Sequence, residues 1–547
     1  MTVLKRITPW QWALIVLLFI LAGYLRFAHL TEQGFLYWDE GMYMNEAKFY
    51  SSLWDHKSYV IDKFMRGLGP EHLIDTIDGW PSSAVKPLHG LMIFFFSFVI
   101  GLHDYTGQVF SAVCALACLW LLFVLIARYS SVPHALITLL ILAVSPYHIM
   151  FSRATFPEMD SALFYYASLL LYFKTLPVEN ARKRTLFAAG MLFGCTLVTN
   201  YRWFILIPSF ALFDLINTPG VFKTGKFSFV KRMFFLGSGL ASVVAVIDLP
   251  YVLVKQTMTL PIEFSSYHTQ AVYYVSDIFM KLRTLTLRPL YFNILLESNG
   301  YLLICCLGLG TLALLLKKDK TPFERSMLVL FYYVFIGISI VEKGYFARNY
   351  SIVYPAAAFI MAYGVRSFIQ CCFKRAAVRN AVLGTLVIAI LIRGSVAAQP
   401  FVHIRSGYRE ARDYLASVGG KNCLATTNSV FEFYFGRNVA DHFYAHNDYF
   451  LRDMERKPFS HIVVDYVQFL VHQGGVIELY DYLRTHRKPV KIIANPMGDR
   501  LPVVLESARH CDHPGDTYSR LMNDPHTREI RIYSTEGLVE ELKGHNT

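Results

Sequence analysis

Long apolar stretches recur between residues 10 and 398, and short polar or charged segments separate them. A helix needs about 20 mostly apolar residues to cross a bilayer, and most of these stretches approach that length. The pattern therefore predicts a multi-pass helical membrane protein with about eleven transmembrane helices. The predicted spans are residues 10–29, 105–127, 133–150, 159–176, 186–199, 203–217, 233–254, 299–316, 325–341, 351–369 and 380–398.

One further apolar run, residues 87–101, is short for a full crossing and suits an interfacial or re-entrant helix. If it does not cross, the basic clusters between the spans all fall on one side of the membrane. The positive-inside rule assigns that side to the cytoplasm. We therefore expect a cytoplasmic N-terminus, and we expect residues 30–104, 255–298 and 399–547 to lie outside the cytoplasm.

The pattern changes near residue 399, which divides the chain into a membrane domain (1–398) and a C-terminal domain (399–547). Short β-branched runs alternate there with helical patterns, as in a soluble α/β domain. In an extracytoplasmic compartment Cys423 and Cys511 could form a disulfide, or both could remain buried thiols. The predicted strands are 422–427, 461–465, 490–494 and 529–533, and the predicted helices are 406–418 and 480–485.

The composition supports a membrane protein, since 54% of the 547 residues are hydrophobic and 15% are aromatic. The net charge of +12 raises the question of nucleic-acid binding. The basic residues cluster between apolar spans, however, so topology and anionic lipids explain them better, and we expect no nucleic-acid partner. No CxxC pair among the nine cysteines has a partner pair, so a zinc cluster is not expected.

Candidate chemistry gathers on the predicted outer side. Asp39 and Glu40 follow the first span directly, and a carboxylate there could take a proton from a hydroxyl group. Cations on this side run against the topological bias, and arginine and lysine are the residues that bind phosphate. These residues together predict transfer of a group from a lipid phosphate to a hydroxyl. The candidate cations are Lys86, Arg153, Arg202 and Arg348.

Each candidate also has a structural interpretation. Asp39 could cap the helix that follows it, and Glu158 could complement a helix dipole. Any one of the arginines could extend toward lipid headgroups, and His268 could be an ordinary loop residue. The functional interpretation therefore rests on the co-location of these side chains.

Five short segments carry a resemblance to a known group of enzymes. They are residues 38–43, 86–91, 152–160, 190–201 and 345–355. In order and placement they resemble the GT-C type membrane glycosyltransferases that use polyprenyl-phosphate sugars. This group includes the protein O-mannosyltransferases and the lipid A aminoarabinose transferases (glycosyltransferase 39/83-like). The resemblance covers about residues 8 to 398.

The resemblance implies a glycosyltransferase of the cell (inner) membrane that moves a hexosyl or pentosyl group from a polyprenyl-phosphate donor to a hydroxyl. The acceptor would be a lipid, a glycan or a protein. Asp39 would be the general base, with Glu40 and Glu158 as further catalytic residues, and the reaction would invert the configuration of the anomeric carbon. Lys86, Arg153, Arg202 and Arg348 would hold the lipid phosphate, and Tyr43, His89, His268 and Tyr350 would contact acceptor or donor.

Two departures and one alternative belong to this prediction. Val85 stands where aminoarabinose transferases carry an acidic metal ligand, so a divalent metal is possible but not supported. Asn200 replaces a lysine of many relatives, and Arg202 could substitute for it. The alternative is a transporter or flippase for a lipid-linked or anionic solute. Few ionisable residues lie mid-span, where transport pathways place them, which favours the enzyme.

Overall fold

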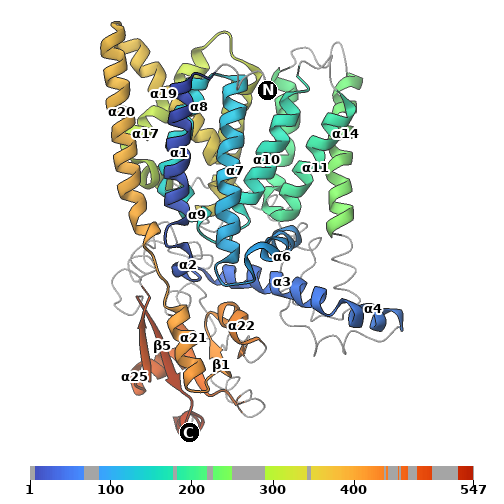
Figure 1. Ribbon diagram of the computed structural model, residues 1–547, viewed down its shortest axis with the longest axis vertical. Helices are drawn as coiled ribbons and strands as arrows, with labels where there is room; N and C mark the ends of the chain where they lie inside the picture. Colours follow the sequence, from blue (N-terminus) through green and yellow to red (C-terminus); the bar gives the residue numbers. More distant parts are fainter. Residues whose placement is uncertain are drawn as a thin grey trace.

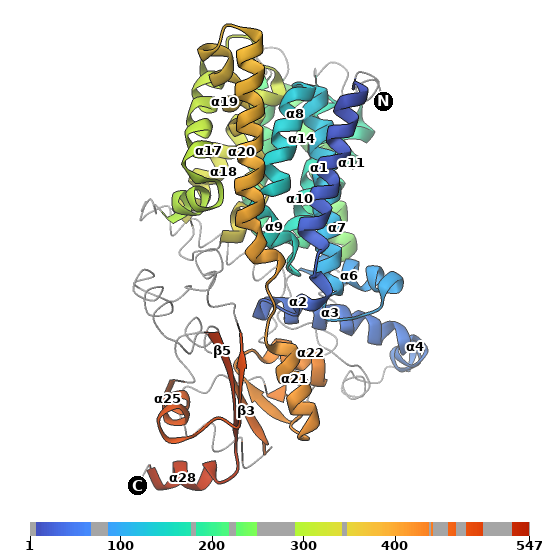
Figure 2. The ribbon, with the colours of Figure 1, turned by 60° about the vertical axis from the view of Figure 1, so that its left-hand side comes forward.

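Helices form an upright bundle, and a small α/β unit lies beyond one end of it (Figure 1). The N-terminus lies at the opposite end of the bundle from this unit, and Figure 2 shows the same arrangement after a turn of 60°. The computed structural model describes residues 7–66, 86–176, 182–217, 226–248, 290–341, 347–436, 439–440, 454, 458–465, 477–495 and 528–545.

Within the described residues every predicted span corresponds to helical structure, and residues 249–254 of the predicted span 233–254 lie outside them. The helix α17 contains a break at Gly300, whose φ of 72° only glycine adopts readily, close to the predicted start of that span. The bundle contains α1 (Pro9–Phe27), α7 (Thr106–Tyr129), α8 (Val132–Val144), α9 (Pro146–Ser152), α10 (Glu158–Phe173), α11 (Lys183–Thr199), η3 (Tyr201–Leu206), α12 (Ile207–Asn217), α14 (Lys226–Val243), η4 (Val244–Asp248), α17 (Leu290–Leu316), α18 (Pro322–Val341), η5 (Ala347–Tyr350), α19 (Tyr354–Cys372) and α20 (Ala376–Val402).

Length and hydropathy qualify five helical segments of the described residues as membrane spans, and a sixth if the bent pair α8 and α9 counts as one. A multi-pass membrane protein is therefore confirmed, and the total of about eleven spans stays a prediction. The five segments are Pro9–Gln33, Thr106–Tyr129, Phe229–Ile247, Ser298–Leu316 and Ala376–Val402.

The predicted span 133–150 consists of two helices, because the chain bends by 64° between α8 and α9. Pro146 has no N–H to continue the hydrogen-bond ladder of α8. Ser145 then caps the new helix, since its hydroxyl accepts a hydrogen bond from the His148 N–H at 3.3 Å.

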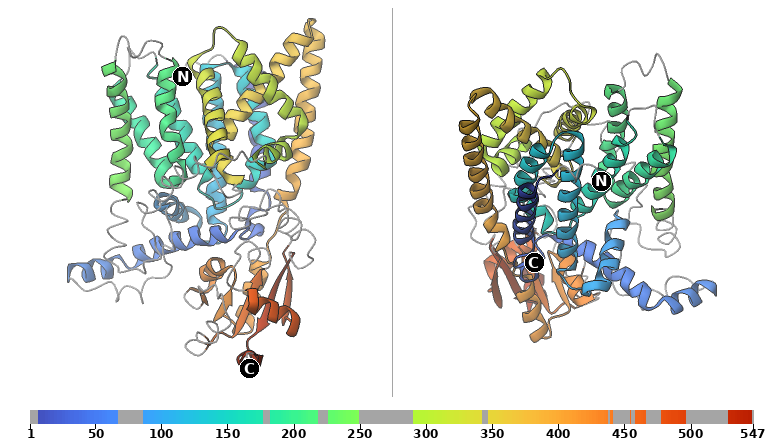
Figure 3. Two further views of the ribbon diagram at one scale, coloured as in Figure 1. Left: turned by 180° about the vertical axis from the view of Figure 1, so that it is seen from behind. Right: turned by 45° about the horizontal axis from the view of Figure 1, so that its top comes forward.

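Three helices lie at the end of the bundle that faces the α/β unit. The first two, α3 (Trp38–Asp55) and α4 (Lys57–Met65), extend sideways from the bundle in both views of Figure 3. The third, α6 (Pro87–Ile100), is the short apolar helix, which has 14 residues and lies at the same end (Figure 1), in agreement with the prediction that it does not cross. The one-turn helix α2 (Leu30–Gln33) precedes them.

The described residues between 403 and 545, which we call the C-terminal unit, form a five-stranded sheet with helices, and they include every predicted strand and helix. The strand order is β2-β1-β3-β5-β4, with β1, β2 and β3 parallel and β5 antiparallel to both neighbours. Cys423 is a buried free thiol in the first strand, and Cys511, the other cysteine of the predicted pair, lies outside the described residues. The elements are α21 (Tyr408–Ser417), β1 (Cys423–Ala425), α22 (Asn428–Phe435), β2 (Val439–Ala440), β3 (His461–Asp465), α25 (Ile477–His486), β4 (Lys491–Ala494), β5 (Glu529–Ser534) and α28 (Leu538–His545).

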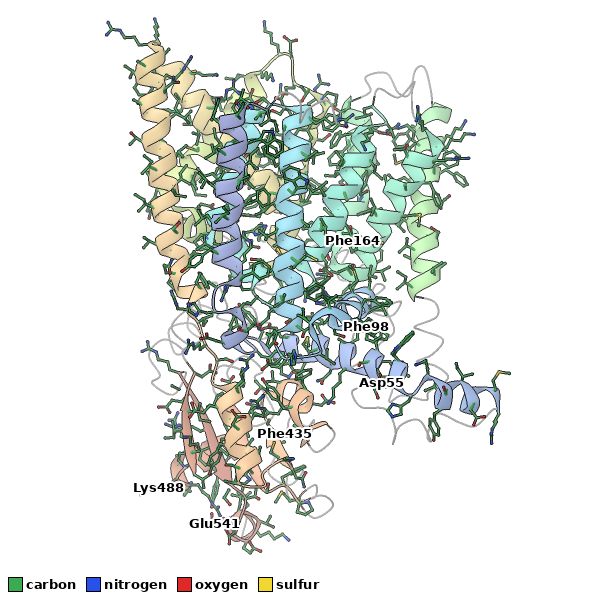
Figure 4. The ribbon with its side chains drawn as sticks, in the orientation of Figure 1. Asp55, Phe98, Phe164, Phe435, Lys488 and Glu541 are labelled. Carbon is green, nitrogen blue, oxygen red and sulfur yellow. The ribbon has the colours of Figure 1, made fainter. Side chains whose placement is uncertain are left out.

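One hydrophobic core runs from the bundle into the C-terminal unit. Phe35 and Phe110 belong to the same buried cluster as Phe431 and Val463. In Figure 4, Phe435 of α22 lies on the side of the unit nearest the bundle, whereas Lys488 and Glu541 lie on its far side. The helix α22, which the sequence did not predict, makes the contact with α3.

Candidate active site

An ion pair joins the first turn of α3 to the segment before α19. Asp39 is the second residue of α3, and its Oδ2 accepts a hydrogen bond from Arg348 Nη1 at 2.6 Å. The Arg348 side chain is 4% exposed and that of Asp39 is 26% exposed, so the ion pair is largely but not fully buried. Burial raises the pKa of Asp39, but the charges of Arg348, Lys86 and Arg202 outweigh it and lower that pKa to about 2.

Lys86 lies beside this pair. It is the residue before the first turn of α6, and its Nζ donates a hydrogen bond to the Tyr43 hydroxyl. Burial, followed by the cations Arg348 and Arg202, lowers the pKa of Lys86 to about 7. Burial and the charge of Asp39 raise the pKa of Tyr43 well above its ordinary value, so this phenol is neutral.

Glu158 and Arg202 complete the group. Glu158 begins α10 and is fully buried, and its Oε1 accepts a hydrogen bond from Asn200 Nδ2 at 3.3 Å. Among the described residues, Glu158 Oε2 has no hydrogen-bond partner. The charges of Glu158 and Arg202 both act on the pKa of Lys86, which places them near its ammonium group. We call the six side chains the charged cluster: Asp39, Tyr43, Lys86, Glu158, Arg202 and Arg348.

Glu40 lies next to Asp39 in sequence but has a different environment. It is fully buried, and its carboxylate accepts four hydrogen bonds. Oε1 accepts from the N–H groups of Leu36 (2.6 Å) and Tyr37 (3.0 Å), and Oε2 from Thr155 N–H (2.7 Å) and Gln108 Nε2 (3.0 Å). Burial raises the pKa of Glu40, although these donors favour its anion. Its oxygens therefore hold the start of α3.

Arg153, a predicted phosphate ligand, is not brought to the charged cluster. Its Nε donates to Gln33 Oε1 at 3.1 Å, and Nη1 donates to the carbonyls of Arg26 (3.0 Å) and Ala28 (2.9 Å). Nη2 donates to the carbonyl of Val402 at 3.1 Å. The last carbonyls of a helix lack partners within the helix, so this guanidinium binds the ends of α1 and α20 together.

Two predicted contact residues take supporting positions. His89 Nδ1 lies 2.9 Å from Asp160 Oδ2, both side chains are buried, and the imidazole packs edge-to-face on the Tyr43 ring at 5.1 Å. Tyr350 is buried and packs against the Phe335 ring at 5.5 Å. His89 therefore supports the charged cluster from behind Tyr43, and Tyr350 anchors the segment that carries Arg348.

His268 lies outside the described residues, as does Val85, the position that bears on a metal. Within the described ranges, no three His, Cys, Asp or Glu side chains lie close enough to hold a metal ion.

Sequence reasoning missed polar residues that complete the site. Asp160 and Gln108 each lie within the first turn of an apolar helix, at the end that meets α3. A buried ionisable or amide side chain in such a run is costly unless it is paired. That signal was available, and here Asp160 pairs with His89 while Gln108 binds Glu40.

Comparison with known proteins shows which proteins the chain is similar to. The family described as dolichyl-phosphate-mannose-protein mannosyltransferase matches residues 83–251 of the 547. Solved structures of two GT-C glycosyltransferases have a similar fold, which confirms the predicted resemblance to that type. No curated protein sequence matches the chain significantly.

The two structures cover most of this chain at low identity. ArnT from Cupriavidus metallidurans bound to undecaprenyl phosphate is 14% identical with a TM-score of 0.56, over 88% of this chain and 96% of that one. The archaeal oligosaccharyltransferase AglB from Archaeoglobus fulgidus, in complex with an inhibitory peptide and a dolichol-phosphate, is 10% identical with a TM-score of 0.53. That match covers 84% of this chain and 69% of that one.

Proposed function

We propose that this protein is a glycosyltransferase that moves a sugar from a polyprenyl-phosphate donor to a hydroxyl acceptor at the outer face of the membrane. The observation that carries the proposal is the Asp39 carboxylate paired with Arg348 beside Lys86. A base and a cationic phosphate site then lie next to each other at one end of a membrane bundle. The two solved structures, which have a similar fold at low sequence identity, contain a dolichol-phosphate and undecaprenyl phosphate.

The cations hold the phosphate of the donor. Lys86, Arg202 and Arg348 bring up to three positive charges against two carboxylates, Asp39 and Glu158. A phosphate departs readily once its charge is neutralised, and guanidinium groups bind it in a bidentate way. Arg153 stabilises the helix bundle and does not bind the phosphate, because its N–H donors all bind carbonyl or amide oxygens of the protein.

Asp39 takes the proton of the acceptor hydroxyl. The hydroxyl oxygen forms a bond to the anomeric carbon while the bond between that carbon and the phosphate oxygen breaks. This displacement inverts the configuration of the anomeric carbon. Polyprenyl phosphate leaves with the bonding electrons, and the proton ends on Asp39. The ion pair with Arg348 lowers the basicity of Asp39, and a donor phosphate that shares Arg348 raises it again.

The proposed orientation follows the charge distribution of the loops. A cytoplasmic N-terminus places the charged cluster and the C-terminal unit on the opposite side of the cell (inner) membrane. The N-terminus and the C-terminal unit lie at opposite ends of the bundle, which supports this arrangement (Figure 1). The acceptor class is a lipid, a glycan or a protein, and the sugar is a hexose or a pentose.

A donor panel tests the proposal. The purified protein, in lipid extracted from its own membrane, is given radiolabelled polyprenyl-phosphate hexoses and pentoses in turn. We expect label to pass from one donor class to an acceptor in the extract. Flux of the labelled lipid across sealed liposomes, with no new product from any donor, would refute the enzyme and support the flippase.

A further inference from the structure

The C-terminal unit contacts the helix that carries the proposed base, within one turn of that base. Gly41 in the first turn of α3 is buried against the start of α22. A Cβ on Gly41 would lie 2.5 Å from the carbonyl carbon of Ser429 and 2.6 Å from the amide nitrogen of Val430. Both are backbone atoms, which cannot rotate aside, so glycine permits this approach of the two helices.

Two hydrogen bonds cross the same contact on either side of Gly41. The Ser429 hydroxyl donates to the carbonyl of Trp38 at 2.6 Å, and the Asn45 side chain donates to the carbonyl of Ser429 at 2.8 Å. Trp38 is the residue directly before Asp39. The Ser429 hydroxyl thus bonds the turn that presents the carboxylate, and the Ser429 carbonyl bonds α3 farther along the helix.

A second set of contacts fixes the unit on the bundle. Arg409 of α21 donates to both oxygens of Asp104 at 2.6 and 2.5 Å, and the Tyr434 hydroxyl donates to Asp104 at 2.7 Å. The Phe433 ring packs edge-to-face on Phe35 at 5.4 Å. Asp104 precedes α7 and Phe35 precedes α3, so these contacts hold α22 relative to the bundle as well as to α3.

We infer that the C-terminal unit positions the first turn of α3, and that Gly41, Asn45 and Ser429 are positioning residues for the Asp39 carboxylate. The inference rests on the proposed function. Orientation of a catalytic group matters steeply, since a misplacement of about 1 Å costs about 100-fold in rate. Donor binding depends on Lys86, Arg202 and Arg348, which all lie outside α3, so turnover and donor affinity should separate.

Two substitutions in the full-length protein test the inference, each with a matched control. Gly41→Ala forces α22 away and should lower kcat by about 100-fold. Ser429→Ala removes only the hydroxyl bond to Trp38 and should lower kcat by about fivefold. The controls are Gly237→Ala, where nothing lies within 4 Å of the added Cβ, and Ser417→Ala, whose hydroxyl bonds only within α21.

Two further measurements separate positioning from general damage. Binding of undecaprenyl phosphate should change by less than about threefold in all four variants, and amide hydrogen exchange over residues 38–45 should rise only in the Gly41 and Ser429 variants. Turnover equal to the controls would overturn the inference, as would a joint loss of turnover, lipid affinity and protection throughout the bundle. An inactive wild type would refute the proposed function instead, and unchanged exchange over 38–45 would then refute this inference separately.

Discussion

Raising the pH should weaken binding of the sugar-phosphate donor, because Lys86 loses its proton near neutral pH. Burial and the neighbouring arginines lower its pKa to about 7 from an ordinary value of 10.5. A donor phosphate adds an anion beside the ammonium group and raises that pKa again. The contribution of the Lys86 charge to donor affinity is therefore complete below pH 7. It is lost as the pH rises from 7 toward the pKa that Lys86 has in the donor complex.

The size of the effect follows from the two pKa values. If the phosphate restores the ordinary value of 10.5, affinity falls by about tenfold for each pH unit above 7, or about 90-fold between pH 6 and pH 9. A smaller restoration gives a smaller fall. The donor itself is a phosphodiester and stays a monoanion over this range, so its ionisation does not contribute.

The assay is equilibrium binding of a polyprenyl-phosphate sugar to the wild type and to Lys86→Arg at several pH values. Arginine stays charged throughout, so the variant should show an almost flat profile. A flat profile in the wild type, or a profile equally steep in Lys86→Arg, would refute the assignment of Lys86 to the donor phosphate.

Three other substitutions probe the supporting structure. Glu40→Gln places an NH2 group against N–H donors, and Arg153→Lys leaves helix-end carbonyls unpaired, so each should lower the free energy of unfolding by about 1–3 kcal/mol. Thermal denaturation checks both; an unchanged melting temperature in either variant would contradict its structural role. Asp104→Asn weakens the contact with Arg409 and should speed proteolytic release of the C-terminal unit, whereas Asp413→Asn, at an exposed pair, should not. Equal cleavage rates in the two variants would contradict the anchoring role of Asp104.

Hydrophobic patterning predicted most of the fold, because membrane helices and buried strands each have a simple period. The strand at 461–465 and the short helix from Pro87 follow directly from such runs. The bend between α8 and α9 was not predicted, since apolar residues continue through it and Pro146 alone marks the break. The helix α22 was missed because Asn428–Phe435 is short and its aromatic residues resemble a strand pattern.

The candidate site was partly predictable for a different reason. Topology places Asp39 and Arg348 at the same end of the bundle, and the structure brings them within 2.6 Å. Sequence could not distinguish Arg153 from Arg348, because the direction of each side chain depends on distant partners. Arg153 meets the carbonyl of Val402, 249 residues away, and this contact has no signal in the local sequence.

The most direct test of the central claim compares sugar transfer by the wild type and by Asp39→Asn. Asparagine can accept the hydrogen bond from Arg348 but cannot take the hydroxyl proton, so transfer should fall by about 10²–10⁴-fold. Binding of polyprenyl phosphate should be equal or tighter, because one anion leaves the charged cluster. Asp413→Asn, at an exposed carboxylate, is the matched control. Transfer by Asp39→Asn at the wild-type rate would contradict the account.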